Sequence, residues 1–163
     1  MKQKKINPAI KLLLKTLIII GVFACVIAFV FTPYRVVGNN MFPFVQDGNL
    51  AIFYQLGELT TNDVILYQDN NGNKKIGRVV ATAGQIVKFS EDGYEIDGYT
   101  PSETNPYSTT ATDLTKYPLS IQADTYFVLN DFRADEDDSR KNGTVNSDQI
   151  IGKLFFLFRC RDF

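Results

Sequence analysis

The chain has 163 residues, of which 45% are hydrophobic and 13% aromatic, a composition that suits one packed domain plus an anchor. Its formal net charge of −1 is unevenly spread, because residues 1–32 hold five lysines and no acid, whereas the remainder holds twelve basic and eighteen acidic residues. An acidic domain argues against nucleic-acid binding. The absence of histidine excludes Ser-His-Asp, Cys-His and the common zinc sites. We therefore expect no metal and no cofactor.

The first expected element is a transmembrane helix at residues 10–32. No charge occurs from Thr16 to Thr32, and all five lysines precede that run. This lysine bias predicts residues 1–9 in the cytoplasm and residues 33–163 outside the cell membrane, in a single-pass topology. A cleaved signal peptide, cut after Ala28, is the alternative. The apolar run continues through Phe31 and favours a retained anchor. Low cysteine use, with Cys25 and Cys160 as free thiols, fits a Gram-positive surface.

Short runs rich in β-branched and aromatic residues, separated by turn residues, follow the anchor. They predict strands at residues 35–37, 49–56, 63–68, 75–82, 86–89, 94–96, 126–129 and 150–158. The turn residues between Asp69 and Asn73 predict a hairpin. Residues 99–122 are rich in Thr, Ser, Pro and Asn, and predict an irregular insertion. The pattern as a whole predicts an all-β domain of barrel-like or coiled-sheet type.

Three motifs occur in order along this domain. The first reads Gly38-x-Asn40-Met41-x-Pro43, and the second reads Ile76-Gly77-Arg78-Val79-Val80. The third lies between Asn130 and Gly143, and its characteristic residues are Asp131, Arg133, Asp138, Ser139 and Arg140. With an anchor before them and a closing strand after them, the ordered motifs resemble those of type I signal peptidases.

In that family a serine of the first motif attacks the peptide bond and a lysine of the second takes its proton. The corresponding positions of this chain hold Asn40 and Gly77. An amide cannot act as the hydroxyl, and glycine has no side chain. The sequence therefore predicts a protein without enzymatic activity, in which Lys75 lies too far along its strand to replace the base. The alternative is an active serine-type peptidase whose catalytic site is displaced or unusual.

The resemblance also implies a groove that binds an extended polypeptide. Its expected lining is Gly38, Asn39, Asn40, Met41, Ile52, Tyr54, Arg78 and Val80. The third motif is expected to form a structural network of Asp131, Arg133, Asp138, Ser139 and Arg140. The losses at Asn40 and Gly77 are similar to those in signal-peptidase-like proteins of Gram-positive pilus loci. That similarity implies a membrane-anchored chaperone or accessory factor for pilus assembly, with a pilin backbone precursor and a class C sortase as partners.

Overall fold

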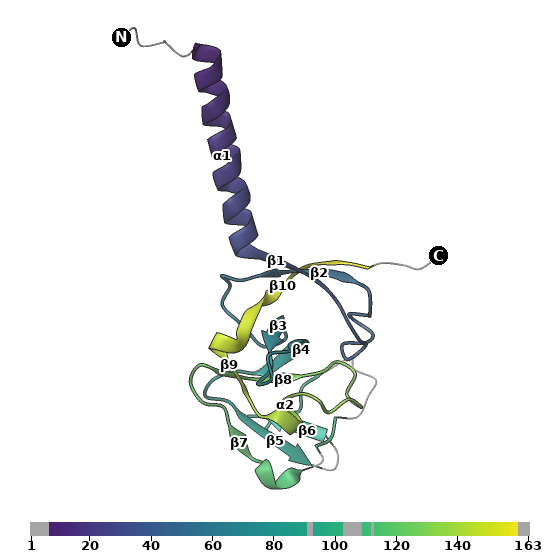
Figure 1. Ribbon diagram of the computed structural model, residues 1–163. Coiled ribbons are helices and arrows are strands. Elements are labelled where there is room, and N and C mark those ends of the chain that lie inside the picture. Colours follow the sequence, from purple (N-terminus) through teal and green to yellow (C-terminus); the bar gives the residue numbers. More distant parts are fainter. Residues whose placement is uncertain (1–6, 91–92, 103–108, 112, 160–163) are drawn as a thin grey trace.

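The computed structural model describes residues 7–90, 93–102, 109–111 and 113–159. A single long helix, α1 (Pro8–Val30), projects from a β domain (Figure 1). The Asn7 side chain accepts a hydrogen bond from the Ala9 N–H and caps the helix start. At 1.5 Å per residue, α1 extends about 35 Å, which is enough to cross the hydrocarbon core of a membrane. Its length and apolar composition make α1 a candidate membrane span, and none of its residues is buried.

The expected anchor at 10–32 ends differently from the prediction. The helix stops at Val30, and Phe31 and Thr32 already belong to strand β1 (Phe31–Arg35). The Gln55 N–H donates to the Val30 carbonyl, so the helix end is fixed to the sheet. The strand expected at residues 35–37 therefore lies earlier in the chain, and it ends at Arg35, where it was expected to begin.

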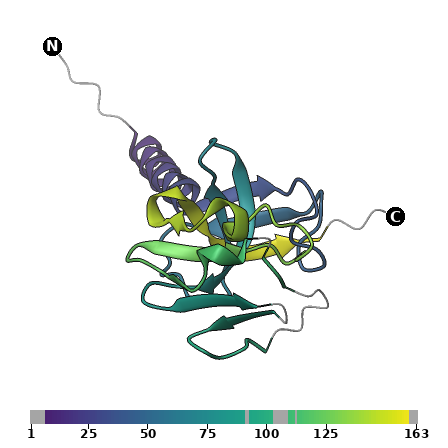
Figure 2. The ribbon, with the colours of Figure 1, turned by 90° about the horizontal axis from the view of Figure 1, so that it is seen from below.

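The domain consists of two antiparallel sheets. The larger has the order β1-β2-β10-β3-β4-β8-β9, and the smaller has the order β6-β5-β7. The strands after β1 are β2 (Leu50–Tyr54), β3 (Val64–Gln68), β4 (Lys74–Ala81), β5 (Ile86–Ser90), β6 (Gly93–Ile96), β7 (Leu119–Ser120), β8 (Thr125–Leu129), β9 (Val145–Asn146) and β10 (Ile150–Phe158). The hairpin β5–β6 lies at the side of the domain away from α1 in both ribbon views (Figures 1 and 2). This mostly-β architecture is the predicted fold class.

Three short helical segments complete the described chain, namely α2 (Ser139–Asn142), η1 (Leu114–Lys116) and η2 (Ser147–Gln149). Segment η1 and strand β7 lie within the stretch 99–122 that was expected to be irregular. Residues 103–108 and 112 of that stretch, and Cys160, lie outside the described residues.

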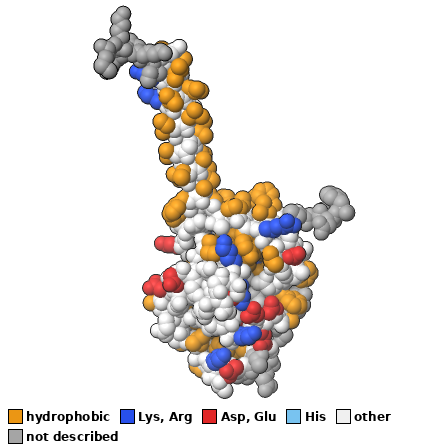
Figure 3. Space-filling model, in the orientation of Figure 1, with side chains coloured by type: hydrophobic (Ala, Val, Ile, Leu, Met, Phe, Trp, Pro, Cys, Tyr) orange, Lys and Arg blue, Asp and Glu red, His pale blue; other side chains and the backbone are white. Residues whose placement is uncertain are grey.

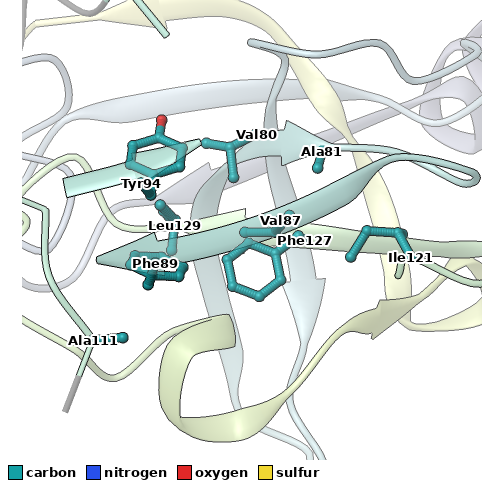
Figure 4. Close-up of a cluster of buried hydrophobic side chains, with 9 residues drawn as sticks. All are labelled: Val80, Ala81, Val87, Phe89, Tyr94, Ala111, Ile121, Phe127 and Leu129. Carbon is teal, nitrogen blue, oxygen red and sulfur yellow. The ribbon is translucent and has the colours of Figure 1, made fainter. Parts of the chain in front are cut away.

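The core is divided into clusters along the larger sheet. One cluster joins the two sheets, with Phe89 of β5 near Phe127 of β8, and it also includes Val80 of β4 (Figure 4). A second cluster includes Met41 and Phe53 under the part of the sheet next to α1. The alternation of buried Ala51 and Phe53 with less buried neighbours in β2 is the period-two pattern of a sheet with one face on the core.

Candidate functional site

The first motif lies in a loop between β1 and β2 that is closed by two side-chain bonds. The Gly38 N–H donates to Asp47 Oδ1 at 2.8 Å, and the Asp47 N–H donates to Asn39 Oδ1 at 3.1 Å. Gly38 has a φ of +87°, which suits glycine and turns the chain into the motif. These contacts fix the backbone immediately before Asn40.

Asn40 ties three distant segments together. Its Nδ2 donates to the Ile76 carbonyl of β4 at 2.8 Å and to Asn130 Oδ1 after β8 at 3.1 Å. Its own carbonyl accepts from the Phe132 N–H at 2.9 Å. Asn40 therefore acts as a structural amide that joins the first motif to β4 and to the loop after β8.

A hollow of about 250 Å³ opens beside Asn40. Its wall combines the first motif with the start of β4 and the loop after β8. The lining residues are Tyr34, Val37, Gly38, Asn39, Asn40, Lys74, Lys75, Ile76, Asn130, Asp135 and Asp137.

Two of the charged residues in this wall, Lys75 and Asp137, form an ion pair. The Lys75 Nζ lies 2.7 Å from Asp137 Oδ2 and 3.5 Å from Asp69 Oδ2. Partial desolvation lowers the pKa of Lys75, but the hydrogen bonds and charges of Asp137 and Asp69 together outweigh it, so the pKa is raised. Hydrogen bonds from Lys75 and Asn142 lower the pKa of Asp137. At neutral pH this pair is an ammonium next to a carboxylate, and Lys75 is not a neutral base.

Gly77 lies in a buried part of β4, opposite β8. A Cβ added at this glycine would fall on Val128 Cγ1, with Leu129 O and Tyr67 Cε1 each 3.5 Å away. Val128 therefore fills the space that a lysine at this position would enter.

The expected groove residues separate into three groups. Gly38, Asn39 and Asn40 line the hollow. Met41 and Val80 are 1% and 2% exposed in the core clusters, so the expectation that they contact a ligand is corrected. The sequence does not distinguish these two positions from groove residues, because apolar side chains occur both in grooves and in cores.

The remaining expected groove residues lie elsewhere on the sheet. Ile52 and Tyr54 alternate with the core residues of β2 and lie on its outer face, away from the hollow. Arg78 forms a bidentate ion pair with Asp131, with Nε 2.7 Å from Oδ1. Its guanidinium also lies 5.1 Å from the centre of the Phe44 ring. Arg78 therefore connects loops rather than lining the hollow.

The third motif forms the core of the loop that supports the hollow. Asp138 and Arg140 are a buried ion pair with N–O distance 2.7 Å. Arg140 also donates to the carbonyls of Thr110, Arg133 and Asp135. The Asp138 carboxylate accepts from the Asn130 N–H, which places Asn130 next to Asn40. The motif also reaches a distant strand, because Asp131 forms an ion pair with Arg78 of β4.

The other two members of the expected network are also buried. Ser139 Oγ accepts a hydrogen bond from the Val128 N–H at 2.9 Å, so this serine acts as a structural acceptor. The Arg133 guanidinium lies 5.7 Å from the centre of the Tyr94 ring. Sequence reasoning missed Tyr34, Lys74, Asp135 and Asp137 as lining residues of the hollow; for Asp135 and Asp137, the available signal was the run of acids at 135–138. In the described part of the chain, acidic and cysteine side chains form no cluster suited to a metal ion.

Comparison with known proteins identifies the class to which this fold and site belong. The chain belongs to the signal peptidase family, peptidase S26, whose model matches residues 9–159. It is 28% identical to signal peptidase IB of Staphylococcus aureus, with 80% of this chain and 78% of the relative covered. It is 31% identical to signal peptidase I of Bacillus caldolyticus, with 84% and 86% covered.

The fold agrees with this assignment. A crystal structure of a signal peptidase I from Enterococcus faecalis matches with a TM-score of 0.52 and 24% identity, and covers 62% of this chain and 100% of that chain. The relatives are named as peptidases, and this finding overturns the expectation that the chain has no enzymatic activity.

Proposed function

We propose that this protein is a membrane-anchored peptidase of its family, acting on extended polypeptide segments through a catalytic centre that differs from the serine–lysine pair. The observation that supports the proposal is the hollow beside Asn40, where the first motif, β4 and the loop after β8 meet. An extended peptide that enters there can form main-chain hydrogen bonds to the lining segments. The names of its relatives supply the reaction class.

Residue 40 cannot supply the nucleophile, so we assign that role to a water molecule. The titratable carboxylates and ammonium that line the hollow are Asp135, Asp137, Lys74 and Lys75. Asp137 would accept a proton from the water molecule as the water oxygen bonds to the carbonyl carbon of the peptide. It would then pass this proton to the amide nitrogen as the carbon–nitrogen bond breaks and the amine leaves. The Lys75 ammonium would stabilise the negative oxygen. Because the pKa of Asp137 is lowered, it is a weak base, and turnover should be slow.

The test uses the full chain in lipid nanodiscs with a signal-sequence peptide, and mass spectrometry detects cleavage products. We expect slow cleavage that is lost in Asp137→Asn and retained in the matched surface variant Asp113→Asn. Binding without cleavage by the wild type would refute the peptidase reading. Cleavage that persists unchanged in Asp137→Asn would refute the assignment of the centre.

We also propose how the chain is oriented in the membrane and which protein supplies the substrate. The five lysines before the apolar run support a cytoplasmic N-terminus and a domain outside the membrane. A pilin backbone precursor, with a class C sortase as a second partner, stays a prediction from the motif resemblance. A pilin-derived peptide in the same assay tests this prediction separately from peptidase activity.

A further inference from the structure

Asn130 is a buried amide that contacts two different walls of the hollow. It follows β8 directly and is 2% exposed. Its Oδ1 accepts a hydrogen bond from Asn40 Nδ2 of the first motif at 3.1 Å, and its Nδ2 donates to the Asp135 carbonyl at 3.1 Å. One side chain therefore joins the first motif to the loop that carries Asp137.

Backbone carbonyls at both ends fix the orientation of this pair of amides. Asn40 Nδ2 also donates to the Ile76 carbonyl at 2.8 Å, so Asn40 presents a donor to Asn130. Asn130 must then present its oxygen to Asn40, which leaves its nitrogen to donate to the Asp135 carbonyl. An ionised aspartate could not make the second bond, and an aliphatic side chain could make neither. The position therefore requires an amide.

Asp135 passes this restraint on to Asp137. Asp135 Oδ1 accepts from the Asp137 N–H at 3.0 Å, and the Asp135 carbonyl also accepts from Arg140 Nη2 at 2.8 Å. The Asp137 side chain is itself 49% exposed, and its carboxylate bonds to Lys75 and Asn142. Because exposed ion pairs contribute little to stability, the contacts of the loop backbone are needed to hold this carboxylate in place.

The contacts of the Asn130 side chain are separate from those at the two ends of the loop. At its start the Phe132 N–H donates to the Asn40 carbonyl at 2.9 Å, and at its end buried Asp138 caps α2. Residues 135–137 lie between these two points. Removing the Asn130 amide would therefore loosen the middle of the loop while its ends stay in place.

We propose that Asn130 is a positioning residue, which holds the middle of this loop against the first motif and so places the Asp137 carboxylate at the hollow. The inference rests on the proposed function for the role of Asp137 as the base. Asn130 itself transfers no proton, and it acts on Asp137 through Asp135. Displacing a reacting group by about 1 Å can lower a rate on the order of a hundredfold.

The test replaces Asn130 by leucine, which has nearly the same shape as asparagine but forms no side-chain hydrogen bond. The folded state should survive in Asn130→Leu, because the partners of the lost amide each keep another contact. Asn40 Nδ2 still donates to the Ile76 carbonyl, and the Asp135 carbonyl still accepts from Arg140. If Asn130→Leu nevertheless does not fold, Asn130→Ala is measured in the same way.

Asn71→Leu is the matched control, because Asn71 is exposed in the turn between β3 and β4 and its side chain bonds to none of the described residues. Hydrophobic side chains cover α1 along its length (Figure 3), so each variant is made in the full chain and kept in lipid nanodiscs. Two quantities are measured. One is kcat and KM for cleavage of the signal-sequence peptide, and the other is the pKa of Asp137, from the NMR signal of its carboxyl carbon, which Asp137→Asn assigns.

We expect Asn130→Leu to lower kcat roughly tenfold to a hundredfold, with little change in KM. The lowered pKa of Asp137 should rise toward its ordinary value of 3.8, because a displaced carboxylate bonds less closely to Lys75 and Asn142. Asn71→Leu should change neither quantity.

An unchanged pKa of Asp137 in folded Asn130→Leu would overturn the inference, even with a lower melting temperature, because Asn130 would then be structural only. A raised pKa with unchanged cleavage would support the positioning and refute Asp137 as the base. Absence of cleavage by the wild type would refute the proposed function alone, and the pKa of Asp137 would still decide the role of Asn130.

Discussion

Gly77 offers the sharpest test of how β4 is packed. Replacing it with alanine restricts the unfolded chain, which contributes about 0.4–1 kcal/mol of stability where the backbone allows the change. The added Cβ, however, would overlap Val128 Cγ1 in a buried layer. Overpacking of this kind costs about 1–3 kcal/mol. The second effect is larger, so we expect Gly77→Ala to destabilise the protein by about 1–2 kcal/mol.

Thermal unfolding of the full chain in detergent, followed by circular dichroism, measures this effect. A loss of about 2–4 °C per kcal/mol for a chain of this size gives a drop of about 2–8 °C. Val128→Ala removes the overlapping methyl groups, so Gly77→Ala with Val128→Ala should lose less stability than the sum of the single variants. An unchanged or higher melting temperature for Gly77→Ala, with additive effects, would refute the proposed contact.

Three other predictions follow from the site. Arg140→Met should cost about 3–5 kcal/mol in urea unfolding, because it leaves the Asp138 carboxylate buried without its partner; a loss below about 1 kcal/mol would contradict that burial. Because the pKa of Asp137 is lowered in the folded protein, its contribution to stability is present above its ordinary pKa of 3.8 and is lost as pH falls through the lower folded value. The difference in unfolding free energy between wild type and Asp137→Asn should therefore be constant near neutral pH and shrink in acid. A difference that grows in acid would refute the pairing. Asn40→Ser combined with Gly77→Lys should raise peptide cleavage little, because Val128 occupies the space of the lysine; a large gain in product formation would show that the space is available.

Most strands were predictable because their signals are local, whereas the two-residue strands β7 and β9 carry no such signal. Turn residues at 69–73 separate two β-rich runs, and the observed β3 and β4 agree with the predicted limits to within one residue. The end of α1 was not predictable in the same way. Phe31 and Thr32 continue the uncharged run, and an apolar run does not distinguish helix from strand. Pairing of β1 with β2 decides the boundary, and there it joins Phe31 to Tyr54 and Thr32 to Phe53, which are more than twenty positions apart.

The candidate site was only partly predictable for a similar reason. The first motif indicated where the hollow would be, because Gly38 and Asn40 lie within it. The Lys75–Asp137 ion pair joins side chains 62 residues apart, and spacing along the sequence carries no signal for it. Met41 was misplaced because it lies in a loop and is buried in a cluster that includes Phe53 of β2 and Val64 of β3. Topology, rather than local pattern, determines these contacts.

The binding of an extended polypeptide beside Asn40 can be measured directly by photocrosslinking. A signal-sequence peptide with a photoreactive residue near its cleavage position would be added to the full chain in nanodiscs, and mass spectrometry would map the points of attachment. We predict attachment to residues 37–40 and 74–76, which line the hollow. Attachment mainly to the β5–β6 hairpin, or equal labelling of both regions, would contradict the account.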